Sequence, residues 1–399
     1  MGRVGVIGAG LLCASAFGQV ATFQILRNET FPFLGLDYPR ALSADGKVVV
    51  GNYGTRWTAA TGVVPTGFIP GTEKIKQAWA INSDGSIEVG LPVPYNGVGQ
   101  YWSISGATTF TPGTPIVENP GLFGPCQMTD DGAWAIGYAA GAGRPARTNR
   151  LGAWELFPTA DLQGARAFST SADGSVVVGG ASKSGVHYGI AWNVGAGPAG
   201  SASLIIVDDF SANAVSADGK VAAGQRGNRA AVWTIGGTVE VFNPPAGFSN
   251  GSAYSISGDG RVVAGTAGGP FGSTVFVRRN GEQARDLRVV LERFGATGTE
   301  YFLLDTPIGA AVSRDGHVVC GRAFSPWYGL WAFVASIPDW EPCPSDLNFD
   351  GVVDDADFSV FAKAYDQLAT TDGDLNVDRF TDDADFSLFA VAYDALLCP

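Results

Sequence analysis

Short apolar runs recur along most of the chain, and each is bounded by turn-forming residues. Runs such as "KVVVG", "SVVVG" and "RVVAG" each follow an Asp-Gly dipeptide and end at a glycine. Four to eight β-branched or aliphatic residues between such breakers are typical of a strand rather than a helix. From about residue 38 to 337 the pattern therefore predicts many short strands joined by hairpins.

The strand pattern is an internal repeat. Seven Asp-Gly dipeptides are each followed by a glycine six residues after the Asp. Two residues before each Asp stands a Ser or Thr, with Asn82 as the exception. The seven Asp residues are Asp45, Asp84, Asp131, Asp173, Asp218, Asp259 and Asp315. An aromatic residue follows in each copy: Trp57, Trp102, Trp154, Trp192, Trp233, Phe276 and Trp331. Because the copies are spaced at about 40 to 56 residues, each holds about four strands, which is the period of a propeller blade.

The repeats predict a mainly β fold, a seven-bladed β-propeller over residues 20–338. "AVSADGKVAAG" is predicted to be a hairpin with an Asp-Gly turn, in which both central residues can take positive φ. We interpret the seven Asp residues as turn formers rather than catalytic acids, and most of the repeated Trp residues as blade core. Ring closure is expected through the strand "TFQIL" or the strand "WAFVASI". The last repeat contains "DLRVVLERFG", predicted to be a short inserted helix.

The N-terminus has the pattern of a secretory signal peptide. Arg3 precedes an apolar run from Val4 to about Ala16, and cleavage is expected after Ala16 or Gly18. Residues 1–18 are thus predicted to be a signal peptide, with an uncleaved anchor as the alternative. "VIGAG" lacks the third glycine of a dinucleotide-binding loop. After signal removal, no other stretch is long and apolar enough to span a membrane.

The repeat unit "AVSADGKVAAG…AAVWTIGG" resembles the HAF repeat of bacterial extracellular proteins, over about residues 38–337. The His-Ala-Phe triplet that names the family is missing, and "GIAW" and "AAVW" stand in its place. The resemblance implies an extracellular propeller and no established catalytic activity.

Two acid-rich dodecamers near the end of the chain, "DLNFDGVVDDAD" and "DLNVDRFTDDAD", match the ligand spacing of a calcium-binding EF-hand loop. Each is followed by a near-identical amphipathic segment. Two calcium ions are expected. The predicted ligands are Asp346, Asn348, Asp350, Val352 (carbonyl), Asp354 and Asp357 in loop one, and Asp374, Asn376, Asp378, Phe380 (carbonyl), Asp382 and Asp385 in loop two. Because Arg379 replaces the glycine at the sharp turn of loop two, the second site is expected to be the weaker one.

Two loop-helix units with Asp at the twelfth position resemble a dockerin module, here covering residues 343–399 after a linker at 339–344. The resemblance implies calcium-dependent docking to a cohesin-like surface or scaffold protein. It places the partner contacts at Asp355, Ala356, Asp383 and Ala384, with two possible docking orientations. It also implies that the module's ends lie close together, so that Cys343 and Cys398 are expected to form a disulfide. We expect Cys320, a core thiol, and Cys126 to remain unbonded.

The distribution of charge supports this division. From Glu341 onward the chain has 14 acidic residues against Lys363 and Arg379, so this segment carries almost all of the net charge of −13. The propeller region is nearly neutral, which argues against nucleic acid as a partner. The chain has 56 glycines and only two histidines, which leaves little for His-based catalysis. The adjacent acids Asp130–Asp131 and Asp208–Asp209 are the candidates for an acid/base pair.

Three functions remain open. The first is a secreted, non-catalytic binding or scaffold propeller, extracellular or at the cell surface, assembled through the dockerin-like module. The second is a polysaccharide-binding or polysaccharide-cleaving propeller in a dockerin-tethered complex, and the third is a purely structural surface-layer component. The sequence does not identify the propeller's ligand.

Overall fold

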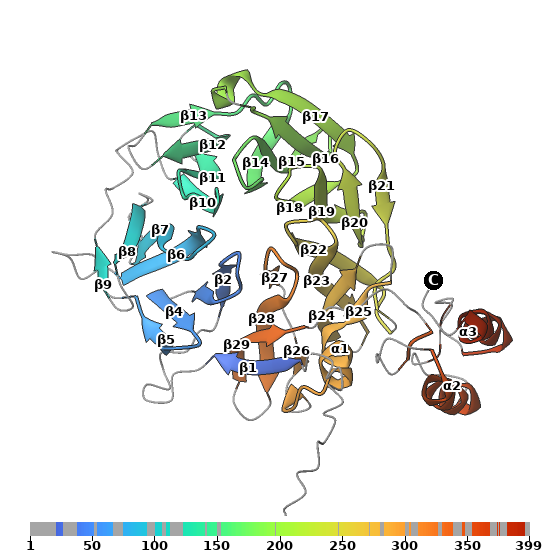
Figure 1. The fold of residues 1–399 in the computed structure, drawn as a ribbon. Helices are drawn as coiled ribbons and strands as arrows, with labels where there is room; N and C mark the ends of the chain where they lie inside the picture. Colours follow the sequence, from blue (N-terminus) through green and yellow to red (C-terminus); the bar gives the residue numbers. More distant parts are fainter. Residues whose placement is uncertain are drawn as a thin grey trace, which may run out of the picture.

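The computed structural model describes residues 21–26, 38–51, 54–66, 75–93, 100–105, 109–111, 123–139, 142–149, 153–195, 197–245, 247–270, 272–279, 283–299, 303–304, 310–325, 329–337, 345–347, 353–367, 373, 375 and 381–395. In this part of the chain, antiparallel sheets surround a central axis, and two helices lie outside them (Figure 1). The fold is a β-propeller.

Six of the sheets are regular four-stranded blades, each formed by consecutive strands. The first three contain β2 (Pro39–Leu42), β3 (Val48–Gly51), β4 (Thr55–Thr58) and β5 (Gly62–Pro65); β6 (Ile75–Ile81), β7 (Ile87–Val93), β8 (Gln100–Ser105) and β9 (Thr109–Thr111); and β10 (Phe123–Met128), β11 (Trp134–Ala139), β12 (Arg144–Asn149) and β13 (Trp154–Leu156). The next three contain β14 (Gln163–Thr170), β15 (Val176–Lys183), β16 (Val186–Asn193) and β17 (Ser203–Asp208); β18 (Ser211–Val215), β19 (Val221–Arg226), β20 (Arg229–Thr234) and β21 (Val239–Val241); and β22 (Asn250–Ile256), β23 (Val262–Gly269), β24 (Gly272–Arg279) and β25 (Arg285–Asp286).

The remaining sheet, here called the closing sheet, joins the two ends of the propeller. It has five strands: β1 (Thr22–Leu26), β29 (Gly329–Ser336), β28 (Val318–Ser325), β26 (Leu303–Leu304) and β27 (Ala311–Val312). The prediction of a seven-bladed propeller is therefore wrong: among the described residues there are six four-stranded blades, and the remaining sheet is irregular. The last repeat contributes the long strands β28 and β29, the two-residue strands β26 and β27 and a helix, and the outer strand β1 comes from the other end of the sequence.

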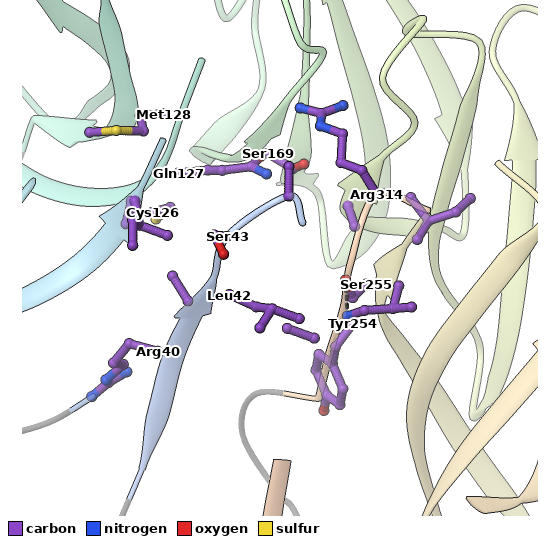
Figure 2. Close-up of a pocket in the computed structure, with 18 of the residues that line it drawn as sticks. Arg40, Leu42, Ser43, Cys126, Gln127, Met128, Ser169, Tyr254, Ser255 and Arg314 are labelled. Atoms are coloured by element: carbon purple, nitrogen blue, oxygen red, sulfur yellow. Dashed lines mark hydrogen bonds between the residues drawn. The ribbon is translucent and has the colours of Figure 1, made fainter. Parts of the chain in front are cut away.

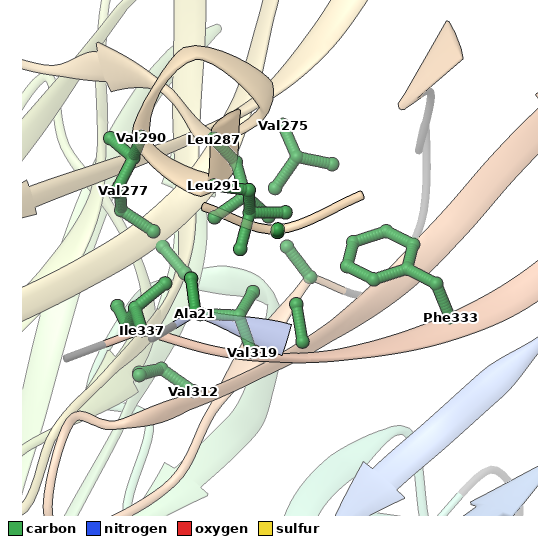
Figure 3. Packing of buried hydrophobic residues seen from close by; sticks show 14 of the residues in the cluster. Ala21, Val275, Val277, Leu287, Val290, Leu291, Val312, Val319, Phe333 and Ile337 are labelled. Atoms are coloured by element: carbon green, nitrogen blue, oxygen red, sulfur yellow. The ribbon is translucent and has the colours of Figure 1, made fainter. Parts of the chain in front are cut away.

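Both strands that were expected to close the ring take part, because β1 pairs with β29. The predicted inserted helix is α1 (Leu287–Arg293), which begins at Asp286, whose side chain accepts a hydrogen bond from the backbone N–H of Arg288. Leu287 and Leu291 of α1 pack with Val275, Val319 and Phe333 in one buried cluster (Figure 3). The helix thus fills the space between the sixth blade and the closing sheet.

The repeated Asp-Gly dipeptides do form the hairpin turns, but not in the predicted conformation. Only the glycine has positive φ, for example +72° at Gly219, whereas no Asp of these turns does. Instead, Ser216 Oγ donates to Asp218 Oδ1 (2.7 Å), and Ser216 Oγ accepts from the N–H of Val221 (3.0 Å). The last strand pair is Val215 with Ala222, so the loop is longer than a two-residue hairpin. The Ser side chain bridges this loop.

The aromatic residue of each repeat is mostly core, as expected, but does not occupy one structural position. Three of them, Trp57, Trp192 and Trp233, are buried. Each lies in the third strand of its blade, opposite Val49, Val177 and Ala222 of the second strand. Trp154, by contrast, lies in the fourth strand β13. The matching positions in the third, sixth and closing sheets hold Thr148, Arg278 and Ala335.

The C-terminal segment contains two helices, α2 (Asp355–Gln367) and α3 (Asp383–Ala395). Phe361 and Phe389 stack at the centre of a small core, with ring centroids 5.2 Å apart. The helical prediction for this segment is confirmed. No helix of the described residues combines the length and apolar character needed to cross a membrane.

Candidate functional site: the central channel and the paired helices

The innermost strand of each regular blade has a β-bulge at the same place. The register of the first strand against the second skips one residue in every blade. The skipped residues, here called the bulge residues, are Arg40, Trp79, Cys126, Phe168, Asn213 and Tyr254. A bulge re-aims one side chain out of the regular alternation, and it commonly does so near a binding site.

The glycine six residues after each Asp has a role in this bulge. A Cβ on Gly224 would lie 1.8 Å from the carbonyl oxygen of Ser211, and one on Gly179 would lie 1.9 Å from that of Arg166. Only glycine therefore tolerates the close approach of the bulged inner strand. The repeated glycine is the sequence signal of a bulge, which sequence reasoning treated as the end of a strand.

All six bulge residues line one central cavity of ≈ 530 Å³. Figure 2 shows Arg40, Cys126 and Tyr254 placed around this channel. The guanidinium of Arg40 lies over the indole of Trp79, 4.7 Å from the ring centroid. Burial lowers the pKa of Arg40, and nearby Tyr38 partly opposes this effect. Asn213 donates from Nδ2 to the carbonyl oxygen of Ala253 (2.8 Å), which fixes its orientation.

One end of the channel carries a closed circle of backbone hydrogen bonds, here called the hydrogen-bond ring. In each turn, the residue between the Ser (or its equivalent) and the Asp donates its N–H to the carbonyl of the matching residue in the next sheet. The bonds run Ala44 to Ser83, Ser83 to Asp130, Asp130 to Ala172, Ala172 to Ala217, Ala217 to Gly258, Gly258 to Arg314 and Arg314 back to Ala44, at 2.7–3.1 Å.

Two members of the hydrogen-bond ring are charged, and they pair with each other. Arg314 of the closing sheet donates to Asp130 of the third blade, so the ion pair connects non-adjacent positions of the ring. Burial raises the pKa of Asp130, whereas Arg314 lowers it. The two neighbouring acids have different partners: Asp130 pairs with Arg314, and Asp131 accepts from Thr129 Oγ1 (2.6 Å). Asp208 and Asp209 are both exposed, outside the channel.

The predicted calcium ligands are described only in part. Asn348, Asp350, Val352, Asp374, Asn376, Asp378 and Phe380 lie outside the described residues, as do Cys343 and Cys398. Of the others, Asp357 and Asp385 are completely buried, and Asp346 is 7% exposed. Among the described residues, no group of three or more His, Cys, Asp or Glu is close enough to hold a metal ion.

Two of the described ligand residues make the same contact in both halves of the C-terminal segment. Asp357 Oδ2 accepts from the N–H of Asp354 (3.0 Å), and Asp385 Oδ2 accepts from the N–H of Asp382 (2.9 Å). These bonds join the predicted ninth and twelfth positions identically in both loops. Asp354 Oδ1 and Asp382 Oδ1 in turn accept from the N–H of Ala356 and Ala384, so these bonds also form a capping box at the start of each helix.

The predicted partner residues lie at the start of the helices. Asp355, Ala356, Asp383 and Ala384 are all exposed. The two acids also have a role within the module, which sequence reasoning missed: Tyr365 Oη donates to Asp383 Oδ1 (2.6 Å), and Tyr393 bonds to Asp355. Each helix start is therefore tied to the tyrosine of the other helix.

Thiol predictions can be compared with the structure at two positions. Cys320 is completely buried, and burial raises the pKa of its thiol to about 12, as expected for a core residue. Cys126 is exposed at a bulge of the third blade, and no disulfide joins it to Cys320.

No protein-family model matches this chain, and no curated protein matches it. Solved structures with some similarity include a hydrazine synthase of Kuenenia stuttgartiensis, with 14% identity, 77% of this chain and 96% of that chain covered, and a TM-score of 0.46. TolB from Acinetobacter baumannii has 15% identity, with 67% and 65% covered and a TM-score of 0.38. The propeller of Dos1 has 12% identity, with 72% and 75% covered and a TM-score of 0.41. At these values nothing about function follows from the similarity.

Proposed function

We propose that this chain is a secreted, non-catalytic binding or scaffold protein that is assembled at a cell surface or an extracellular complex through its C-terminal module. The module would bind two calcium ions and then dock to a cohesin-like protein. The propeller would present a ligand-binding channel.

The observation that supports the proposal best is the equivalence of the two halves of the module. Each half has a completely buried Asp at the twelfth loop position, a bond from it to the ninth position, and an exposed Asp-Ala pair at the helix start. A calcium ion would supply a positive charge next to the buried carboxylate in both halves.

The surface of the module is suited to a protein partner. Exposed apolar side chains lie on both helices: Phe358 (43% exposed), Phe386 (45%), Leu388 (48%) and Val391 (73%). Asp355 and Asp383, at the starts of the same helices, are also exposed. Exposed apolar groups and acids on one small module favour a partner that offers an apolar patch and basic or donor groups.

The calcium part is tested by titrating the full chain with CaCl₂ in a calorimeter. Two ions per chain are expected, with the second weaker because Arg379 replaces glycine in loop two. Asp357→Asn and Asp385→Asn should each remove one ion, whereas Asp366→Asn, an exposed acid of α2 outside the loops, should change nothing. A single ion, or an unchanged titration in both loop variants, would count against the proposal.

The docking part is tested with a cohesin-bearing surface protein as the probe. Replacing Asp355-Ala356 alone or Asp383-Ala384 alone should leave near-full affinity, because the other half can still dock. Replacing both pairs should abolish binding, and added salt should weaken it in the unmodified chain. Normal binding by the double variant would show that the docking surface lies elsewhere.

A further inference from the structure

The bulge residues differ from one another, although almost everything around them is repeated. The preceding residue is Ala or Pro in all six blades, and the residue three positions later is the turn's Ser, Thr or Asn. Between them stand an arginine, an indole, a thiol, a phenyl ring, an amide and a phenol. The equivalent position before β27 is Ala310, which also lines the cavity. If this position served only packing, one residue type would suffice at every blade.

The burial pattern points the same way. Ala78 and Ala80 flank Trp79 and are both 1% exposed, whereas Trp79 itself is half-buried, at the cavity wall. Ala167 and Ser169 likewise are buried on both sides of Phe168. At each of these bulges the two flanking residues pack in the blade, and the bulge residue lines the channel.

An ion pair crosses one end of the channel. The hydrogen-bond ring encircles that end, its other members are Ala, Ser or Gly, and the Arg314–Asp130 ion pair connects two of its sides. Ala44, Ser83, Asp130 and Arg314 belong to the cavity lining, so the ring forms its floor. Since the Arg314–Asp130 ion pair crosses the ring, we expect a polymer to enter this cavity only by its end.

The lining combines flat apolar faces with hydrogen-bonding groups. Trp79, Phe168 and Tyr254 supply aromatic rings on different blades, while Arg40, Asn213 and the Tyr254 hydroxyl supply donors and acceptors. Aromatic faces next to hydrogen-bonding groups favour a ligand that also has both features: an apolar ring face and a polar edge. A cavity of ≈ 530 Å³ is within the usual range for small-molecule sites.

We propose that the channel binds the terminal ring of a saccharide chain, and that the bulge residues determine which terminal ring is accepted. Trp79 and Phe168 stack against the sugar faces, and Asn213, Tyr254 and Arg40 bind its hydroxyl or carboxylate groups. This proposal adds a ligand to the binding role proposed above, and it does not depend on the calcium module.

The test is a binding screen of the purified full chain on arrays of linear oligosaccharides with defined neutral and uronic-acid ends, together with cyclic glucans, which have no end. Binding to linear chains that share one terminal ring is expected, with none to the cyclic glucans. Calorimetry with the best linear oligosaccharide then gives the affinity with and without a calcium chelator. The affinity should not change, which separates this result from any failure of calcium-dependent docking.

Three variants locate the site. Cys126→Phe fills the channel from an exposed position and should weaken binding at least about tenfold. Tyr254→Phe removes one hydroxyl without changing shape and should weaken it about 2- to 10-fold. Ile206→Phe, at an exposed position of the outer strand β17, is the matched control and should bind normally. Absence of binding across the array, binding to cyclic glucans, or full affinity in Cys126→Phe would overturn the proposal.

Discussion

At the residue scale, the Asp-Gly turns join each sheet to the one before it. The glycine of each turn lies against the first residue of the preceding sheet's second strand in six of the seven turns, as Gly219 lies against Val176 and Gly260 against Val221. A Cβ on Gly219 would approach Val176 Cγ2 to 2.7 Å. The glycine is therefore required for two separate reasons, a positive φ and the contact between sheets.

Two variants separate these reasons. Gly185 also has positive φ (+81°), but a Cβ there meets nothing within 4 Å. Gly185→Ala should cost only the conformational penalty, about 1 kcal/mol, whereas Gly219→Ala should cost about 2–4 kcal/mol, because Val176 must also move. Urea unfolding followed by tryptophan fluorescence measures the difference. Equal losses in the two variants would show that the contact between sheets contributes nothing.

At the element scale, the hairpins could be predicted from the sequence, whereas the bulges and the closing sheet could not. The residue types of Asp218 and Gly224 are enough to predict a turn and a strand end. The number of repeats and the spacing of the strands could therefore be predicted from the sequence. The bulge at Asn213 depends on how the strand pairs, and the sequence shows it only as a position that fails to repeat. The fourth-strand location of Trp154 and the five-stranded closing sheet depend on tertiary pairing, which local patterns do not determine.

The helix pair shows the same limit, because the repeated Asp and Tyr residues were visible but their cross-pairing was not. The hydrogen bond to Asp383 raises the pKa of the Tyr365 phenol above its ordinary value. The two bonds connect the starts of the helices, at loop positions next to the predicted calcium ligands.

Tyr365→Phe and Tyr393→Phe should therefore loosen the module by similar amounts, because they remove equivalent bonds. Hydrogen-exchange mass spectrometry of peptides from α2 and α3 is the measurement. Faster exchange in both helices is expected for either variant, and Tyr188→Phe in β16 serves as the control. An effect confined to one variant would mean that the two halves are not equivalent.

At the scale of the whole molecule, the turn acids make stability depend on pH. Hydrogen bonds from Ser86 lower the pKa of Asp84, and the backbone N–H of Ser175 lowers that of Asp173. At Asp45 and Asp218 burial alone would raise the pKa, but hydrogen bonds, foremost those from Ser43 and Ser216, outweigh it. All four values are lower in the folded chain than in the unfolded one.

A lowered folded pKa means that the folded state favours the ionised carboxylate. Its contribution to stability is present above about pH 4, the unfolded value, and is lost as pH falls through the lower folded values. The thermal midpoint should therefore drop between about pH 4 and pH 2. Asp218→Asn, which keeps an acceptor but cannot titrate, should reduce this drop. A midpoint that is constant from pH 6 to pH 2 would contradict the prediction.

The closing sheet holds the ring together through β1. Five residues of β1 pair with β29, and Thr22 Oγ1 also bonds to Ser336 Oγ (2.7 Å). Deleting residues 1–26 should leave β29 as an exposed edge, because no other described strand occupies that side. Light scattering after size exclusion should then show association between copies, and Thr22→Val in the intact chain should remain monodisperse if the intact chain is. A deletion variant that behaves like the intact chain would show that β1 is dispensable.

The pairing of β1 with β29 also determines when the ring can close during synthesis on the ribosome. Leu26 is made early and Gly329 late, and at ~5–20 residues per second the about 300 residues between them take roughly 15–60 s. For that whole interval each finished sheet can dock on its predecessor, while the first strand waits without its partner. A chain that stops before residue 329 therefore keeps β1 without its partner strand. Such a chain is an open arc of sheets with an unpaired strand edge, the feature by which it differs from the closed ring.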